Sequence, residues 1–516
     1  MKRVFPWVVT VAFTLVLFAA SLWLGEVNQD EGWYLYAGRL AAEGELPFID
    51  FATTQGPVMS LAYAAAWPLV RAWGVAGGRL FTAALGLLTA ALAGVLAWRR
   101  SGKEFRACAA FLAFAFIGLN LYQAYFFSIV KTYSLSALLL AAGFLALTFL
   151  EGRGRKVAAA LAGVLLALAA GVRLSAGFAA PVVWVWLLRR RRQGGAAWVF
   201  LGAAALTGAA VFLPFLILAP EATWFGLVEY HAGREVGGAA RALAYKGGFL
   251  ARLVHAYFVP LAALAVALVV RPRAVHATRP ALPLWSTVIV ISAVHFLAPF
   301  PYDDYQVMVF PLFAVALGTL LAGLPAFRLP HAALVVLLSL AAAFSSPRLQ
   351  SWLVTRDRIW WPLRTQTPLG RLREAGALVR ALSGEDDLLL TQDTYLAVEA
   401  DRRVPRGLEL GPFSYFPEWE RARAARCHVL NREMLRALIA TTPAPVAAFS
   451  GYGLSIRSPS VTALSPAEQA ALNALVQSRY TLYTTIPRFG QAETPLRVLV
   501  ARDQIPGGGE GQILNP

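Results

Sequence analysis

The chain has 516 residues, of which 58% are hydrophobic and only 15% are charged. Soluble proteins have about a quarter of their residues charged, so this composition excludes a soluble protein and indicates one that crosses a membrane several times. The formal net charge of +17 does not indicate nucleic-acid binding, because the basic residues cluster in loops between apolar segments, where they orient membrane helices.

Eleven apolar segments are predicted to be membrane spans, given that a helical crossing needs roughly 20 residues. They lie near residues 5–24, 78–98, 107–127, 132–150, 157–172, 175–188, 197–219, 249–270, 282–299, 306–323 and 330–345. Basic clusters occur in alternate loops, at residues 2–3, 99–106, 153–156, 189–192, 271–279 and 328. Placing these clusters in the cytoplasm predicts a multi-pass protein of the inner (plasma) membrane with its N-terminus inside and its C-terminal part outside. We expect the first segment to be a retained span and not a cleaved signal peptide, because its apolar run continues through Leu24.

Two parts of the chain are predicted to fold on the outer face. The first is a long loop, residues 25–77, whose stretches 32–42 and 56–73 have the pattern of helices that lie in the membrane interface. The second follows Phe344, where helical runs (369–382, 431–440 and 465–478) alternate with short apolar strands (388–391, 446–449, 480–485 and 496–501). We therefore expect a transmembrane domain, residues 1–345, and a small extracytoplasmic α/β domain, residues 346–516, that ends in a flexible tail after Pro506.

Two adjacent carboxylates, Asp30 and Glu31, follow the first span. Charged groups beside hydrocarbon are costly, so their presence indicates chemistry or ion binding. One interpretation is local: Asn28 caps a helix, and Glu31, three residues later, completes a capping box. The other is catalytic: an ionised carboxylate near the start of a helix acts as a general base towards an acceptor hydroxyl. The two interpretations are compatible.

A second acidic pair, Asp303-Asp304, lies in the aromatic segment 299–306, between the ninth and tenth predicted spans. The pair could cap the tenth span. If it converges with Asp30, the carboxylates could instead hold a divalent cation such as magnesium, manganese or calcium. A third alternative is that one pair orients a sugar or an acceptor through hydrogen bonds.

Two cations, Lys131 at the start of the fourth span and Arg173 in a tight turn, fall on the outer face, against the prevailing charge distribution. They could snorkel to lipid headgroups or clamp a phosphate, which Arg binds with a planar fork and Lys as a point charge. His231, Arg234 and Glu235, in the loop after the seventh span, are weaker candidates for substrate contact. No Walker motif, dinucleotide fingerprint or zinc spacing occurs, so nothing indicates ATP-driven transport.

The arrangement of these motifs resembles the GT-C superfamily of integral-membrane glycosyltransferases, which includes protein O-mannosyltransferases and lipid A aminoarabinose transferases. The shared features, over roughly residues 5–345, are one span followed by Asp30-Glu31-Gly32-Trp33-Tyr34, then Gln55-Gly56-Pro57, Lys131-Thr132-Tyr133, Gly171-Val172-Arg173 and the segment from Tyr302 to Pro311. The aminoarabinose branch usually has Lys-Pro-Pro where this chain has Gln55-Gly56-Pro57, and the mannosyltransferase branch has extra loop domains. The branch and the acceptor therefore stay open.

The resemblance implies transfer of a sugar from a polyprenyl-phosphate donor to a lipid, glycan or protein acceptor outside the cytoplasm. It implies that Asp30 is the general base, with Glu31 as its neighbour or substitute, and that Lys131 and Arg173 bind the donor phosphate. The candidates for substrate contact are Tyr34, Gln55, His231, Tyr302, Asp303, Asp304 and Tyr305. The main alternative is a transporter or lipid flippase that uses outer-face carboxylates as ion relays; a non-catalytic membrane scaffold is a further one.

Overall fold

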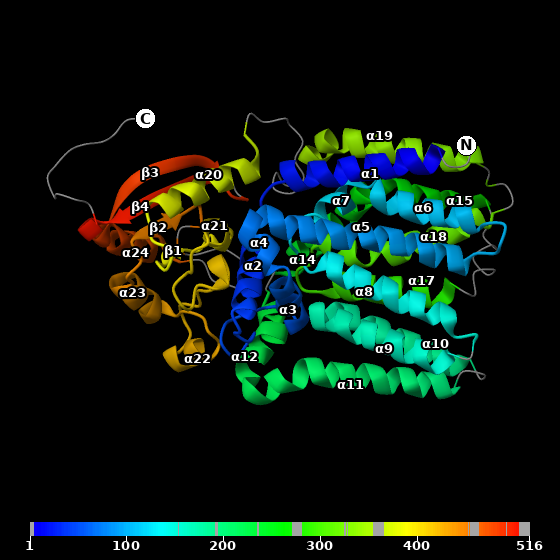
Figure 1. Cartoon of the computed structure of the whole chain (residues 1–516), viewed down its shortest axis with the longest axis horizontal. Helices are drawn as coiled ribbons and strands as arrows, with labels where there is room; N and C mark the ends of the chain where they lie inside the picture. Colours follow the sequence, from blue (N-terminus) through cyan, green and yellow to red (C-terminus); the bar gives the residue numbers. More distant parts are fainter. Residues whose placement is uncertain are drawn as a thin grey trace.

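The computed structural model describes residues 5–504, apart from residues 153, 191–193, 235–236, 271–280, 325–326, 328, 354–365, 453, 455–463 and 492. A bundle of helices occupies one end of the long axis and a smaller part built on a sheet occupies the other (Figure 1). This architecture confirms the predicted fold class. Parts of the predicted pattern lie outside the described residues: the basic residues at 2–3, 153, 191–192, 271–279 and 328, Glu235, and the predicted tail from Pro506.

The bundle consists of apolar helices that run side by side along the long axis (Figure 1). They are α1 (Phe5–Leu24), α5 (Val75–Arg100), α6 (Arg106–Gly118), α7 (Leu121–Phe126), α8 (Tyr133–Ala146), α9 (Arg155–Val172), α10 (Ala179–Arg189), α11 (Gly194–Leu218), α15 (Phe258–Val270), α17 (Leu282–Leu297), α18 (Phe310–Ala322) and α19 (Leu329–Leu353). Among the described residues, α1, α5, α9 and α11 are each long and apolar enough to cross a membrane alone. The chain is a multi-pass membrane protein, and the count of eleven spans stays a prediction.

The predicted span at 249–270 is divided into two helices. α14 (Ala239–Ala256) and α15 meet at an angle of 88°. Pro260 explains the break, because it has no N–H to bond to the carbonyl four residues earlier, at Ala256, where α14 ends. The side chain of Asn120 donates a hydrogen bond to this Ala256 carbonyl at 2.8 Å, which satisfies the freed acceptor.

Three short helices cross the end of the bundle next to the sheet: α2 (Gln29–Ala42), α3 (Pro57–Ala65) and α4 (Trp67–Trp73) (Figure 1). α2 is buried along most of its length. Arg39, in the last turn of α2, is buried, since its guanidinium donates to the carbonyl of Arg402 at 3.1 Å and pairs with Asp401. The sheet-containing part covers this side of the helix.

The sheet has the strand order β1 (Leu389–Thr391), β2 (Val446–Phe449), β4 (Thr494–Ala501) and β3 (Tyr480–Phe489). β1 and β2 are parallel, with Leu389 opposite Val446, and the other neighbours are antiparallel. Both parallel strands are buried at every residue, which explains their continuously apolar sequences. Around the sheet lie α20 (Pro368–Ala381), α21 (Thr394–Ala400), α22 (Arg421–Arg426), α23 (Arg432–Thr441) and α24 (Pro466–Arg479).

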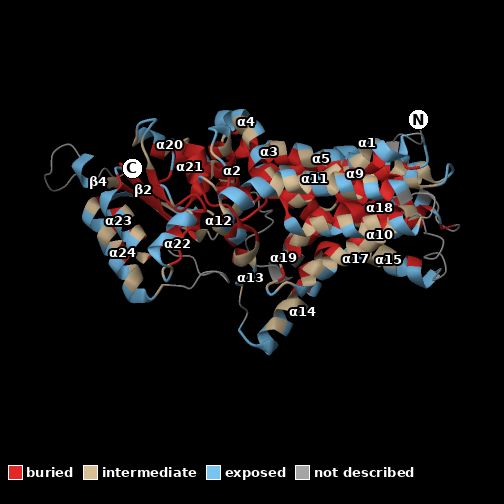
Figure 2. Ribbon diagram, turned by 90° about the horizontal axis from the view of Figure 1, so that it is seen from below, coloured by how far each residue is buried: buried red, intermediate tan, exposed pale blue. Residues whose placement is uncertain are grey.

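The junction between the two parts is a close contact of α2 with α21, and buried residues continue through it (Figure 2). Gly32 makes this contact possible. A Cβ at Gly32 would lie only 2.3 Å from the backbone nitrogen of Tyr395 and 2.5 Å from the hydroxyl of Thr394. The helix that carries the first acidic pair is therefore held directly against the sheet-containing part.

Candidate active site

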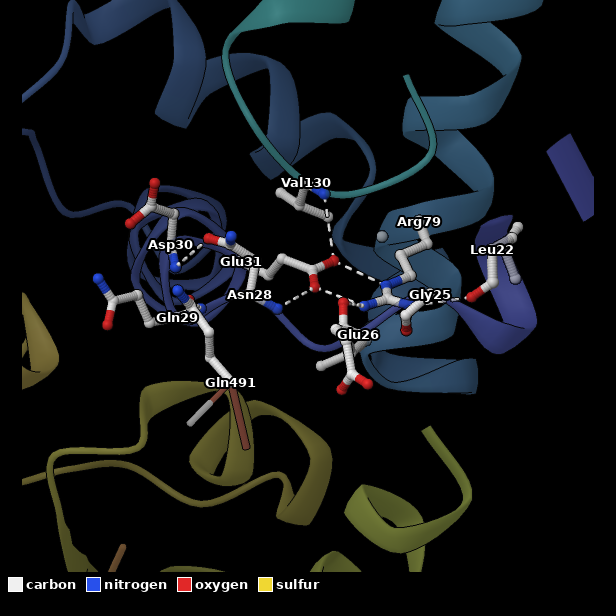
Figure 3. A network of polar contacts seen from close by, with 12 residues as sticks. Leu22, Gly25, Glu26, Asn28, Gln29, Asp30, Glu31, Arg79, Val130 and Gln491 are labelled. Atoms are coloured by element: carbon white, nitrogen blue, oxygen red, sulfur yellow. Dashed lines mark hydrogen bonds and ion pairs between the residues drawn. The ribbon is translucent and has the colours of Figure 1, made fainter. Parts of the chain in front are cut away.

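Asp30 and Glu31 lie in the first turn of α2, and the predicted capping box is confirmed. The Asn28 side chain accepts a hydrogen bond from the Asp30 N–H at 3.0 Å, and Oε1 of Glu31 accepts one from the Asn28 N–H at 2.9 Å. Because an α-helix has 3.6 residues per turn, consecutive side chains point in different directions. Figure 3 shows the Asp30 and Glu31 carboxylates on different sides of α2.

The Glu31 carboxylate is fully buried and its hydrogen bonds are saturated (Figure 3). Its two oxygens accept hydrogen bonds from the Arg79 guanidinium at 2.6 and 2.8 Å, from the Asn28 N–H, and from the Val130 N–H at 3.2 Å. An ionised carboxylate has about four lone-pair positions, so none is left for a substrate proton. This geometry does not support the expectation that Glu31 replaces Asp30 as the base.

Arg79, in the second turn of α5, is the partner that holds Glu31. Its remaining N–H groups donate to three backbone carbonyls at the end of α1, those of Leu22, Gly25 and Glu26, at 2.8, 3.1 and 2.8 Å. Together with the two bonds to Glu31, all five guanidinium donors are used. Arg79 therefore joins α1, α2 and α5 at one buried point.

Asp30 points the other way, towards Lys131 in the turn before α8. The Lys131 ammonium lies 3.0 Å from Oδ2 of Asp30 and 2.8 Å from Oδ2 of Asp304. Burial alone would lower the pKa of Lys131, but the two carboxylates raise it well above its usual value, so the side chain stays charged. The Asp30 side chain keeps 24% of its surface exposed, whereas Lys131 and Asp304 are almost fully buried. Asp30 is thus the member of this cluster that a substrate can reach.

A polar cavity of about 120 Å³ lies beside Asp30. Nine of the eleven predicted site residues line it: Asp30, Tyr34, Gln55, Lys131, Arg173, His231, Tyr302, Asp304 and Tyr305. Arg234 also lines the cavity, so three cations face two carboxylates and leave an excess of one positive charge. Such a cavity suits a ligand with a negative charge.

Arg173, where α9 ends, lies in the cavity wall with a donor unused. Its guanidinium donates to the hydroxyl of Thr132 at 3.2 Å and lies over the Tyr305 ring, 4.0 Å from the ring centroid. Within the described part of the chain, its Nε has no hydrogen-bond partner, and no carboxylate forms an ion pair with it. A buried guanidinium with an unused N–H is ready to bind an anion.

His231 lies in the short helix α13 (Tyr230–Ala232), between α11 and α14, and Arg234 follows this helix. The Nε2 of His231 lies 2.8 Å from the Thr54 carbonyl. Burial lowers the pKa of His231 to about 3, so the imidazole is neutral and donates this bond. Arg234 donates to the Tyr305 hydroxyl at 2.7 Å. These hydrogen bonds hold His231 and Arg234 in the wall of the cavity.

Asp303 is directed away from the cavity, unlike its neighbour Asp304. Its carboxylate is fully buried, pairs with Arg252 of α14 at 2.8 Å and accepts a hydrogen bond from the Tyr122 hydroxyl. Only one residue of each acidic pair, Asp30 and Asp304, therefore lies at the cavity and contacts Lys131. The Lys131 ammonium lies between these two carboxylates, where a divalent cation would otherwise sit. The described residues contain no group of three or more His, Cys, Asp or Glu that could hold a metal ion.

The sequence analysis did not predict Arg79, which holds Glu31, or several residues that line the cavity, among them Thr54, Tyr230, Phe413 and Gln491. The sequence carried a usable signal for Arg79, since it is a cation near the predicted outer end of a predicted span, like Lys131 and Arg173. Phe413 and Gln491 belong to the sheet-containing part and line the cavity with Asp30. Their sequence surroundings give no indication of this placement.

Comparison with solved structures shows that the fold is similar to those of ArnT and of an oligosaccharyltransferase. The structure of ArnT from Cupriavidus metallidurans bound to undecaprenyl phosphate aligns over 95% of this chain and 97% of that one, with a TM-score of 0.60 and 17% identity. ArnT in the apo state gives a TM-score of 0.59 at 18% identity, with the same coverage. The Archaeoglobus fulgidus oligosaccharyltransferase in complex with zinc and sulfate gives 0.50 at 14% identity, over 93% of this chain and 72% of that one. No family model and no curated protein sequence matches the chain. At these identities the likeness concerns the fold alone.

Proposed function

We propose that this protein is a glycosyltransferase that moves a sugar from a polyprenyl-phosphate donor to a hydroxyl acceptor on the outer side of the inner membrane. The observation that carries the proposal is the contact of Asp30 with Lys131 in a polar cavity that also contains Arg173. It combines a reachable carboxylate with buried cations at one end of a membrane bundle. The ArnT structure with the same fold holds undecaprenyl phosphate, which is a lipid phosphate of the proposed donor class.

The donor phosphate would bind to Arg173 and Lys131. When the bond between the sugar carbon and the phosphate oxygen breaks, its electron pair stays on the phosphate. Fixed cations stabilise this developing charge more strongly in a buried site than in water. A phosphate leaving group already carries negative charge and needs no general acid. The excess positive charge of the cavity supports this assignment.

Asp30 would take the proton from the acceptor hydroxyl as its oxygen attacks the sugar carbon. A positioned general base typically contributes about 10²–10⁴-fold to the rate. Asp304 would keep Lys131 in place, and Glu31 would position α2 through Arg79 without touching the substrate. In this proposal the positive charge between Asp30 and Asp304 comes from Lys131. A divalent cation held by these carboxylates was the alternative.

The alternative of a transporter has less support. Transporters built from related halves have discontinuous helices at corresponding positions. The described residues contain one such bent pair, α14 and α15, with no counterpart. The ionic cluster around Lys131 lies where the helices of the bundle end, beside α2, and not in the middle of the bundle.

The test compares the wild-type protein with Asp30→Asn and with Asp50→Asn, an exposed carboxylate in the same outer loop, as the matched control. Each is expressed in cells that lack the chain, and envelope lipids, glycans and proteins are analysed by mass spectrometry. We expect a sugar modification with the wild type and the control and none with Asp30→Asn, at equal protein levels. Modification that persists in Asp30→Asn would remove Asp30 as the base. If the wild-type protein changes no envelope component, the proposed function fails.

A further inference from the structure

The sheet-containing part supplies two residues to the cavity wall, and they come from separate segments. Phe413 lies in a short 3₁₀ helix, Gly411–Phe413, and Gln491 lies at the tip of the hairpin between β3 and β4. The cations that would bind the donor phosphate, Lys131 and Arg173, come instead from turns at the ends of the membrane helices. The cavity thus has one wall from each part of the protein.

The hairpin tip is shaped to direct Gln491 towards α2. The pairing of β3 with β4 shifts register between Ile486 and Phe489, and Arg488, Gly490 and Glu493 have φ values of +50°, +69° and +52°. Register shifts and left-handed residues re-aim side chains and concentrate at functional sites. A Cβ at Gly490 would lie 2.4 Å from the Tyr395 hydroxyl, so glycine lets the tip pass close to α21.

The tip is also fixed in place from both sides. Arg371 donates to the carbonyl of Arg488 at 2.8 Å, and the Gly451 N–H donates to the hydroxyl of Thr494 at 2.8 Å. The Phe489 ring packs on Tyr395, with centroids 5.7 Å apart. A side chain presented by such an anchored turn is held in one position and loses little freedom when it binds a substrate.

Gln491 meets the helix of the base one residue before Asp30. Its Oε1 accepts a hydrogen bond from the Gln29 N–H at 2.9 Å. Figure 3 shows Gln491 reaching the start of α2 from the side opposite Val130 in that view. Gln491 therefore lines the same cavity as Asp30 and contacts the residue that precedes it.

We infer that Gln491 is a specificity-determining residue for the acceptor, with the Phe413 ring as its apolar counterpart. The inference rests on the proposed function. Near the base, the reactive hydroxyl gives its proton to Asp30, and a carboxamide with two N–H donors binds a second oxygen next to it. An aromatic ring and a fixed amide on one wall match an acceptor with neighbouring hydroxyls on a ring, which is the chemistry of a carbohydrate.

The test uses two substitutions that separate this role from a structural one. Gln491→Met removes both the oxygen and the N–H donors, whereas Gln491→Glu keeps an oxygen for the Gln29 N–H, removes the donors and adds a negative charge. Gln477→Met, at an exposed glutamine of α24, is the matched control. The full-length proteins receive a radiolabelled undecaprenyl-phosphate sugar, with and without a titrated carbohydrate extract of the cell envelope.

The measured quantities are sugar transferred to the extract and sugar released to water. We expect both Gln491 variants to lower the ratio of transfer to release about tenfold, which is the effect of one lost hydrogen bond, through a higher KM for the extract. The pH profile of release shows whether the added charge of Gln491→Glu disturbs Asp30. A ratio that stays unchanged while both rates fall would show that Gln491 only supports α2, and would overturn the inference. Absence of both activities in the wild type would instead refute the proposed function.

Discussion

The two adjacent carboxylates at the start of α2 should respond to the same kind of substitution in opposite ways. In Glu31→Gln the side chain keeps its size but loses its charge, and its NH₂ group must face an N–H donor, because all four hydrogen-bond positions of Glu31 are occupied by donors. Arg79 is left as a fully buried cation without its carboxylate. Removing one partner of a buried ion pair costs about 3–5 kcal/mol.

That cost is a large share of the roughly 5–15 kcal/mol that stabilises a typical folded protein. We therefore expect Glu31→Gln to lower the melting temperature and the yield of folded protein strongly, while the rate per folded molecule changes little. In Asp30→Asn, Lys131 keeps its 2.8 Å contact with Asp304 and is not left as an unpaired buried cation, so stability should fall less than in Glu31→Gln. The rate should fall about 10²–10⁴-fold.

The assay has two measurements. Size-exclusion chromatography of a fluorescent fusion monitors thermal unfolding in detergent, and sugar transfer is measured per folded molecule. Arg79→Gln and the double variant Glu31→Gln/Arg79→Gln complete a cycle. Because Glu31 and Arg79 contact each other, the loss of stability in the double variant should be clearly smaller than the sum of the losses in the two single variants. A Glu31→Gln protein of wild-type stability that has lost its activity would refute this division of roles.

Three further predictions concern other parts of the structure. Arg173→Ala should weaken binding of undecaprenyl phosphate about tenfold or more, as expected for a charge-assisted hydrogen bond, and calorimetry that gives an unchanged Kd would remove Arg173 from the phosphate site. Burial raises the pKa of Glu409 to about 7, so its contribution to stability is full below about pH 4.5 and is lost as the pH rises through 7. The free energy of unfolding of the wild type should therefore fall by at most about 3 kcal/mol from this residue between pH 5 and pH 8, and the melting temperatures at these two pH values should differ less in Glu409→Gln than in the wild type. Gly32→Ala should cost about 1–3 kcal/mol and lower transfer, because its Cβ would overlap Tyr395, whereas Gly202→Ala, with open space around it, should leave both melting temperature and transfer unchanged.

Local patterns in the sequence were sufficient to predict most elements. The apolar run 446–449 coincides with β2, and the helical run 369–382 differs from α20 by one residue at each end. The grouping of Asp30, Lys131 and Arg173 followed from topology, because alternate basic loops place all three at the same end of the spans. These predictions need only composition, periodicity and the order of the segments along the chain.

Contacts between distant segments could not be predicted in this way. Gln491 is 462 positions from its partner Gln29, and no charge or motif marks it. Glu31 and Asp30 are indistinguishable in the sequence, and their different roles depend on Arg79, whose side chain reaches Glu31 from a predicted span. The divided span at Ala256 follows from Pro260, a signal that was available and went unused.

The position of Asp30 follows from restraints that come from both parts of the protein. The buried ion pair of Glu31 with Arg79 fixes the first turn of α2 to the membrane helices. Gln491 fixes the same turn to the sheet-containing part through the Gln29 N–H, and Gly32 allows α21 to pack directly against the helix. Contacts from both parts thus hold the turn that carries the Asp30 carboxylate, which lies 3.0 Å from Lys131. The sheet-containing part is therefore part of the candidate active site, and a change that loosens its contact with α2 should affect the proposed chemistry as directly as a change in the cavity.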